Sequence, residues 1–93
     1  MNVGVAKMKF RLFGVSSLKE KRSITRRIVN QIRKSHNVSV SEIDAHDSKD
    51  FLVLGFAMVS GSRDVIHNTF ESIADYIELH EGLEMEEMEK ELW

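Results

Sequence analysis

Hydrophobic side chains recur at every second position over residues 1–13. In an extended strand, one face carries Gly4, Ala6, Met8, Phe10 and Leu12, and the other carries Val3, Val5, Lys7, Lys9 and Arg11. This period of two predicts a strand whose first face is covered by other parts of the chain.

The period changes to that of a helix after Ser17, and the helix is predicted to run to about Ser35. Ser17 and Glu20 have the spacing of a capping box, in which each side chain satisfies a backbone amide at the start of a helix. The apolar stripe consists of Ile24, Ile28 and Ile32, with Leu18 and Val29 at its edge. The opposite face carries Lys19, Arg22, Arg26 and Arg33, with Arg27 and Lys34 beside them, so its polar side is almost purely cationic.

Four further elements follow. Residues 37–46 alternate and predict a strand, 47–50 have the composition of a turn, and 51–59 are apolar on both faces, as in a central strand. Ser62 is a suitable N-cap for a second helix that ends at Gly82, with an apolar stripe of Ile66, Phe70, Ile73 and Ile77. Residues 83–93 alternate at first and change phase at Met88, which predicts a final strand with a bulge, a short helix being the alternative.

The predicted order is therefore βαββαβ. This order consists of two split βαβ units. With right-handed crossovers, they form an antiparallel sheet of order 4-1-3-2 with both helices on one face. We predict a single α+β domain of the ferredoxin-like type over residues 1–93, whose helical stripes pack on Met8, Phe10 and Leu12.

Composition narrows the classes of function. The chain contains no cysteine, which excludes disulfides, thiolate metal sites and cysteine nucleophiles. No segment approaches the roughly 18 continuous apolar residues of a membrane span, and the N-terminus has no apolar signal region, so we predict a cytoplasmic protein that does not enter the membrane.

The net charge of −2 hides an uneven distribution. Residues 1–34 contain ten Lys or Arg and one acid, for +9, whereas residues 35–93 contain three Lys or Arg and fourteen Asp or Glu, for −11. Such asymmetry indicates an anionic partner, unless the two halves neutralise each other in the fold.

The first helix is the strongest candidate for a binding site. Lys19, Lys21 and Arg22 lie in its first turns, where the helix dipole disfavours cations unless an anion occupies the free amides. Arg26, Arg27 and Arg33 extend these charges into a stripe suited to phosphates. The alternative is a basic face that is merely solvated.

The other polar groups have simpler interpretations. Lys7, Lys9 and Arg11 would lie beside the acidic last strand and pair with Glu84, Glu86 or Glu89. The third strand lacks the aromatic pattern of an RNA-recognition motif, so RNA would bind the helical side rather than the sheet. Asp44 and His46 are too few for a metal site. We predict no catalytic residues, no cofactor and no metal.

The run from Ser17 to Arg22, SLKEKR, and the segment from Asn37 to Asp44, NVSVSEID, resemble the YlxP-like family of small bacterial proteins of unassigned function. The resemblance extends over nearly the whole chain and implies a ferredoxin-like fold. Genes of this family often lie beside those of ribosome-associated factors, which implies a connection to RNA. The family tends to carry a tryptophan in the hairpin after residue 44, which residues 45–49 lack, so no role of that aromatic applies here.

We therefore predict a non-enzymatic binding module that contacts structured, ribosomal RNA through its basic first helix. The alternative is a protein-protein interaction or homodimerisation domain that uses the open sheet face or a sheet edge, with Val3, Val5 and one side of residues 51–59 providing apolar area. Neither hypothesis involves a small-molecule ligand.

Overall fold

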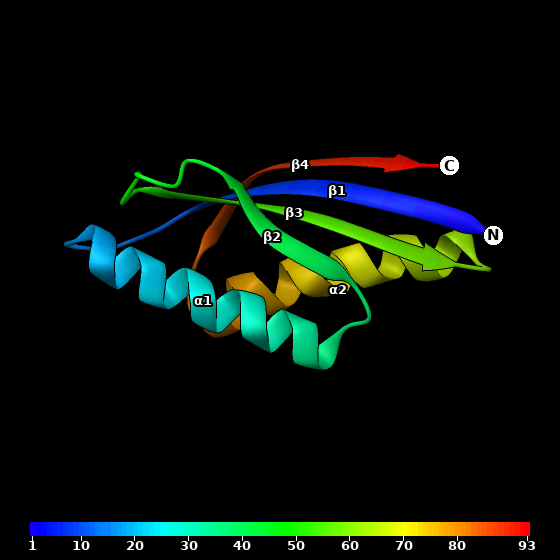
Figure 1. Ribbon diagram of the computed structural model, residues 1–93, viewed down its shortest axis with the longest axis horizontal. Coiled ribbons are helices and arrows are strands. Elements are labelled where there is room, and N and C mark those ends of the chain that lie inside the picture. The colour runs from blue at the N-terminus through cyan, green and yellow to red at the C-terminus, as the bar shows by residue number, and fades with distance from the viewer.

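The computed structural model describes all residues, 1–93, and contains six elements in the predicted order (Figure 1). They are β1 (Asn2–Arg11), α1 (Leu18–Ser35), β2 (Ser39–Asp44), β3 (Phe51–Ser60), α2 (Arg63–Glu81) and β4 (Glu84–Leu92). The four strands form one antiparallel sheet of order β2-β3-β1-β4. This is the predicted order read from the opposite edge, and the prediction is confirmed.

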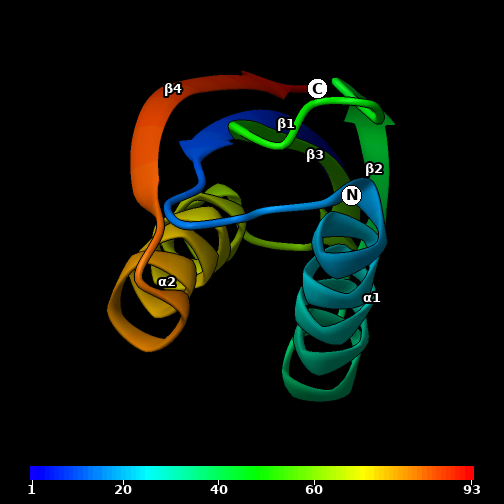
Figure 2. The same cartoon turned by 90° about the vertical axis from the view of Figure 1, so that its left-hand side faces the viewer.

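Both helices cover the same face of the sheet (Figure 2). Helix α1 lies under β2 at one edge, and α2 lies under β1 and β4 at the other edge. The opposite face carries no other element of the chain. Neither helix combines the length and the apolar character that crossing a bilayer requires.

The core forms between the helices and the covered face of the sheet, as the two hydrophobic periods predict. The fully buried positions include most of the predicted set: Met8, Phe10, Ile28, Ile32, Phe70, Ile73 and Ile77. Ile24 is only half-buried and packs at the edge of the core. Helix α2 approaches the backbone of β1 closely, since a Cβ atom on Gly4 would overlap the side chain of Ile66 and lie 3.2 Å from the Phe70 ring.

The C-terminal segment is a strand, and the predicted bulge is present. Lys9 is opposite Glu87 and Phe10 is opposite Met85, so Glu86 is the additional residue on β4. The bulge places Met85 and Met88, three residues apart, on the same covered face, which explains the change of phase in the sequence. Gly82 ends α2 in the left-handed conformation with φ of 69°, as predicted.

Candidate nucleic-acid interface

Helix α1 begins with a set of hydrogen bonds that already places a negative charge at its N-terminus. The Ser17 hydroxyl accepts from the Glu20 amide at 3.1 Å, which is the first half of the predicted capping box. The Glu20 carboxylate accepts from the Ser16 amide at 3.1 Å and from the Ser16 hydroxyl at 2.8 Å. Because this carboxylate occupies the positive end of the helix dipole, the predicted phosphate position at the N-terminus is disfavoured.

These contacts predict a pH dependence of stability. The hydrogen bonds from the Ser16 amide and hydroxyl lower the pKa of Glu20 below its usual value. A carboxyl group whose pKa is lower in the folded state stabilises the fold at pH values above its unfolded pKa of about 4.3, and this stabilisation is lost as pH falls through the folded pKa.

We therefore expect Glu20→Gln to melt at a lower temperature than the original chain at pH 7, with the difference shrinking as pH falls below about 4. Thermal unfolding followed by circular dichroism at several pH values measures the difference. Asp75→Asn provides a control for carboxylate removal from an exposed helical position. A difference that is constant down to pH 2.5 would contradict the assigned role of the Glu20 carboxylate.

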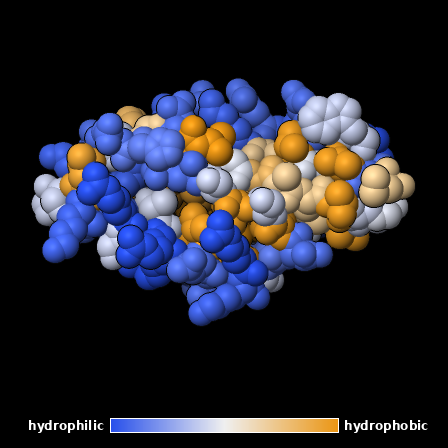
Figure 3. Space-filling model, in the orientation of Figure 1, coloured by the Kyte–Doolittle hydropathy of each residue, from blue (hydrophilic) through white to orange (hydrophobic).

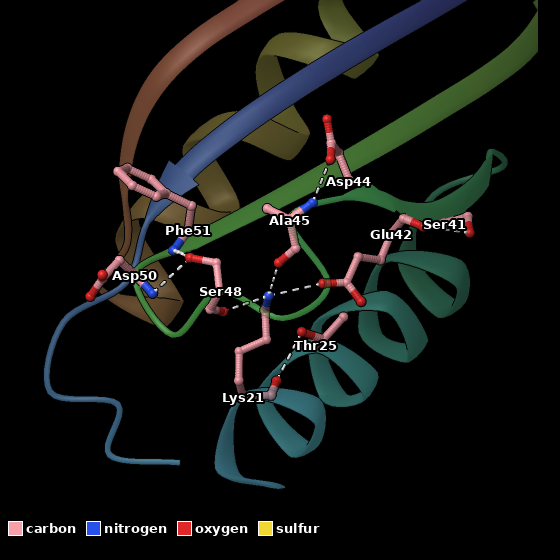
Figure 4. Close-up of polar contacts among 9 residues, drawn as sticks. All are labelled: Lys21, Thr25, Ser41, Glu42, Asp44, Ala45, Ser48, Asp50 and Phe51. Atoms are coloured by element: carbon pink, nitrogen blue, oxygen red, sulfur yellow. Dashed lines mark hydrogen bonds and ion pairs between the residues drawn. The ribbon is translucent and has the colours of Figure 1, made fainter. Parts of the chain in front are cut away.

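Lys21 does not lie on the basic surface. Its side chain is 1% exposed, and its Nζ atom donates to the carbonyl oxygens of Ala45 at 2.8 Å and Ser48 at 2.9 Å (Figure 4). The same nitrogen forms an ion pair at 3.0 Å with Glu42 Oε2, a buried oxygen that accepts no well-aligned hydrogen bond. Lys21 therefore joins α1 to β2 and to the β2–β3 turn and is not accessible to a phosphate group.

The β2–β3 turn is shaped to present these carbonyl groups. Ala45 has a φ of 54°, in the left-handed region, and its amide donates to the Asp44 carboxylate at 2.7 Å. The Ser48 hydroxyl accepts from the amides of Asp50 and Phe51, both at 3.1 Å. With the turn closed by these bonds, the Ala45 and Ser48 carbonyls point toward Lys21 (Figure 4).

The remaining predicted cations differ in their contacts. Lys19, Arg22 and Arg26 are exposed, and none of them forms an ion pair with a carboxylate. Arg33 is exposed and donates to the Val40 carbonyl oxygen at 3.1 Å, which leaves its charge uncompensated. Arg27 pairs with Glu81 of α2 at 2.5 Å, although its side chain remains 60% exposed.

The uncompensated cations share one face of α1. At 100° per residue, the four directions fall within about 60°, and at 1.5 Å per residue the row is about 20 Å long. We call this row the basic stripe; it consists of Lys19, Arg22, Arg26 and Arg33.

The acidic half of the chain lies mostly away from the basic stripe. The glutamates of β4 are at the opposite edge of the sheet from α1 (Figure 2). Three acids of the second half pair with cations of the first half: Glu42 with the buried Lys21, Glu81 with Arg27, and Glu86 with Arg11. The fold therefore neutralises part of the basic half but leaves the cations of the basic stripe without acidic partners.

The sequence predicted that the three cations of β1 pair with glutamates of the last strand, and one of them does so. Arg11 forms an ion pair with Glu86 at 2.6 Å, as predicted. Lys7 and Lys9 are opposite Glu89 and Glu87 in the register of β1 and β4 but form no ion pair with them. The Lys9 ammonium lies 4.4 Å from the centre of the Phe51 ring. No group of three or more His, Asp or Glu side chains is arranged to hold a metal ion.

Sequence comparisons identify relatives without a known function. Residues 3–90 match the model of a family described as "Protein of unknown function (DUF503)". The uncharacterized protein YlxP of Bacillus subtilis is 32% identical over 76 residues, which cover 82% of this chain and 83% of YlxP.

Solved structures share the fold at low identity. A VAO-type flavoprotein from Myceliophthora thermophila superposes with a TM-score of 0.57 and 12% identity, over 99% of this chain but only 16% of the flavoprotein. The de novo designed protein Foldit4 gives 0.56 and 16% identity, over 98% of this chain and 96% of the design. The cofactor-independent oxygenase SnoaB of Streptomyces nogalater gives 0.52 and 13% identity, over 99% of this chain and 90% of SnoaB. Because these identities are so low, the likeness concerns the fold alone.

Proposed function

The chain belongs to the DUF503 family, which includes YlxP, and we propose that it is a non-enzymatic cytoplasmic module that binds structured RNA through the basic stripe of α1. The observation that carries this proposal is the stripe itself, whose four cations lack acidic partners in a chain with a net charge of −2. Uncompensated cations in a row about 20 Å long match the repeated negative charges of a nucleic-acid backbone.

The proposed contact set differs from the set expected from the sequence. Lys19, Arg22, Arg26 and Arg33 remain, because their charges face solvent. Lys21 is left out because it is buried, and Arg27 takes a secondary part because Glu81 already pairs with it. The phosphate groups would therefore lie along the side of α1 and not at its N-terminus.

Backbone contacts of this kind predict shape-dependent binding with little sequence preference. The open sheet face carries Phe51 as its one aromatic residue on β3, so it offers no row of rings on which bases could stack. Ribosomal RNA is our proposed partner, in line with what the family resemblance implies. The β-sheet would take no part in this contact.

The salt dependence of RNA binding tests the proposal. With about four phosphate contacts at roughly 0.7–0.9 each, the slope of log affinity against log salt concentration should be about −3. The variant Arg22→Gln/Arg26→Gln removes two of these contacts and should flatten the slope by about 1.5. Fluorescence anisotropy with labelled ribosomal RNA hairpins, at several salt concentrations, measures both slopes.

The variant Lys49→Gln/Arg63→Gln is the matched control, because it removes the same charge from exposed positions outside α1. Its slope should stay within about 0.5 of the original value if the contacts are local. Equal slopes for the two variants would mean that only the overall charge matters, and the basic stripe would then not be the binding site.

A further inference from the structure

The two termini lie at the same end of the sheet (Figure 1), and the open face carries a hydrophobic patch there. Val3 is opposite Val59, and Val5 is opposite Ala57, in the register of β1 and β3. Trp93 exchanges two backbone hydrogen bonds of 2.8 Å with Val3, so it adds an indole ring beside the same position. We call these five residues the terminal patch. Val59 and Trp93 are 59% and 63% exposed, so the patch meets solvent in the isolated chain.

A hollow extends the patch past the edge of the sheet. Because Ser39 at the start of β2 pairs with Ala57, β3 continues beyond β2 and leaves a groove of about 280 Å³ next to Met58 and Val59. Val3, Val38 and Ala57 complete the apolar part of its lining. Figure 3 shows hydrophobic surface gathered at this end of the molecule.

The area of the open face is sufficient for a stable interface. The four strands contain 35 residues, and at about 3.3 Å per residue and 4.8 Å between strands they present about 550 Å². Two such faces would bury about 1,100 Å², which exceeds the roughly 1,000 Å² expected of a specific protein interface.

The order of the strands makes this face self-complementary. In a face-to-face dimer the two-fold axis runs between the two sheets. If this axis is parallel to the strands and lies over the boundary between β1 and β3, it places β1 of one copy on β3 of the other. The valines of β1 would then pack on Ala57 and Val59 of the second copy. An axis across the strands would instead stack the two β4 strands, whose Glu87, Glu89 and Glu91 line the open face opposite β1, and like charges would repel.

We propose that two copies of this chain associate face to face through the open side of the sheet, with the two terminal patches packed on each other at one end of the interface and the two β4 strands at opposite margins. Both α1 helices lie on the outer surfaces of such a dimer, so the interface and the basic stripe do not overlap. Dimerisation and RNA binding can therefore be tested independently of each other.

Sedimentation equilibrium across a hundredfold range of concentration tests this arrangement. The original chain should approach twice its monomer mass of 10.7 kDa as the concentration rises. Val59→Asp would bury two uncompensated carboxylates in the interface and should weaken dimerisation at least tenfold. Since Val59 is exposed in the monomer, the variant should keep its helical circular dichroism spectrum and its melting temperature as a monomer.

Leu79→Asp is the control, because Leu79 is 82% exposed on α2, away from the open face. It should dimerise as the original chain does. A constant monomer mass for the original chain at every concentration would overturn the proposal, as would a Val59→Asp variant that dimerises with unchanged affinity. RNA titrations of Val59→Asp should give the original salt slope, which separates this result from the test of the basic stripe.

Discussion

Replacing Lys21 by methionine is expected to lower the free energy of unfolding by about 3 kcal/mol. The substitution keeps an unbranched side chain that is one heavy atom shorter, and it removes the ammonium group that faces the Ala45 and Ser48 carbonyls and Glu42. Breaking a buried ion pair by removing one partner costs about 3–5 kcal/mol, because the other charge stays without compensation. We expect the lower end of that range, since the Glu42 side chain as a whole is 17% exposed even though its Oε2 atom is buried.

Urea unfolding followed by circular dichroism measures this loss, and two further variants separate its causes. Lys19→Met, at an exposed position two residues away, should change stability by less than about 0.5 kcal/mol. The double variant Lys21→Met/Glu42→Gln should be less destabilised than Lys21→Met, because no charge is left unpaired. If Lys21→Met unfolds at the same urea concentration as Lys19→Met, the Lys21 ammonium group does not stabilise the contact between α1 and the β2–β3 hairpin.

The role of Lys21 concerns the most specific part of the sequence resemblance. The run SLKEKR suggested an anion site because it concentrates cations at the start of a helix. In the structure, Ser17 and Glu20 act at the helix N-terminus and Lys21 fastens the hairpin. Three of its six residues therefore stabilise the fold, and only Lys19 and Arg22 contribute to the basic stripe.

The sequence did contain a sign that Lys21 is buried. Lys21, Thr25, Ile28 and Ile32 are spaced by four, three and four residues, which is the repeat of a core-facing helical stripe. A lysine in that stripe either reaches past the core to solvent or finds buried partners. Its partners lie 24 and 27 residues further along the chain, so no local pattern identifies them.

Most of the fold could be predicted from the sequence, because each helix and strand shows a hydrophobic periodicity between residues that are close in the chain. The order of the elements and the right-handed hand of the crossovers predicted the strand order. The alternation in β1 and the apolar stripes of α1 and α2 predicted which faces are buried. The change of phase at Met88 predicted a bulge in the last strand, and the structure places it opposite Lys9 and Phe10. The ion pair of Arg27 with Glu81 was not predictable, since the two residues are 54 positions apart and exposed charges have many possible partners.

The second large effect expected is that of Phe70→Ala, which should destabilise the protein by about 3–5 kcal/mol. Phe70 is fully buried in the middle of α2, and its ring lies 6.3 Å, centre to centre, from that of Phe56 on β3. Helix α2 already contacts β1 at Gly4 with no spare room, so it cannot move inward to fill the cavity left by the ring. The loss therefore combines the transfer free energy of the ring with the cost of a cavity that persists.

Urea unfolding of three variants tests this packing. Phe70→Leu should lose less than half as much as Phe70→Ala, because a branched aliphatic side chain fills much of the same volume. Phe13→Ala, at a position that is 60% exposed, should change stability by no more than about 0.5 kcal/mol. A loss below about 1 kcal/mol for Phe70→Ala would mean that the contact between α2 and β1 is not the centre of the core. Because small domains are stable by only about 5–15 kcal/mol, the expected loss would remove a large part of the total and should be visible as a clear fall in melting temperature.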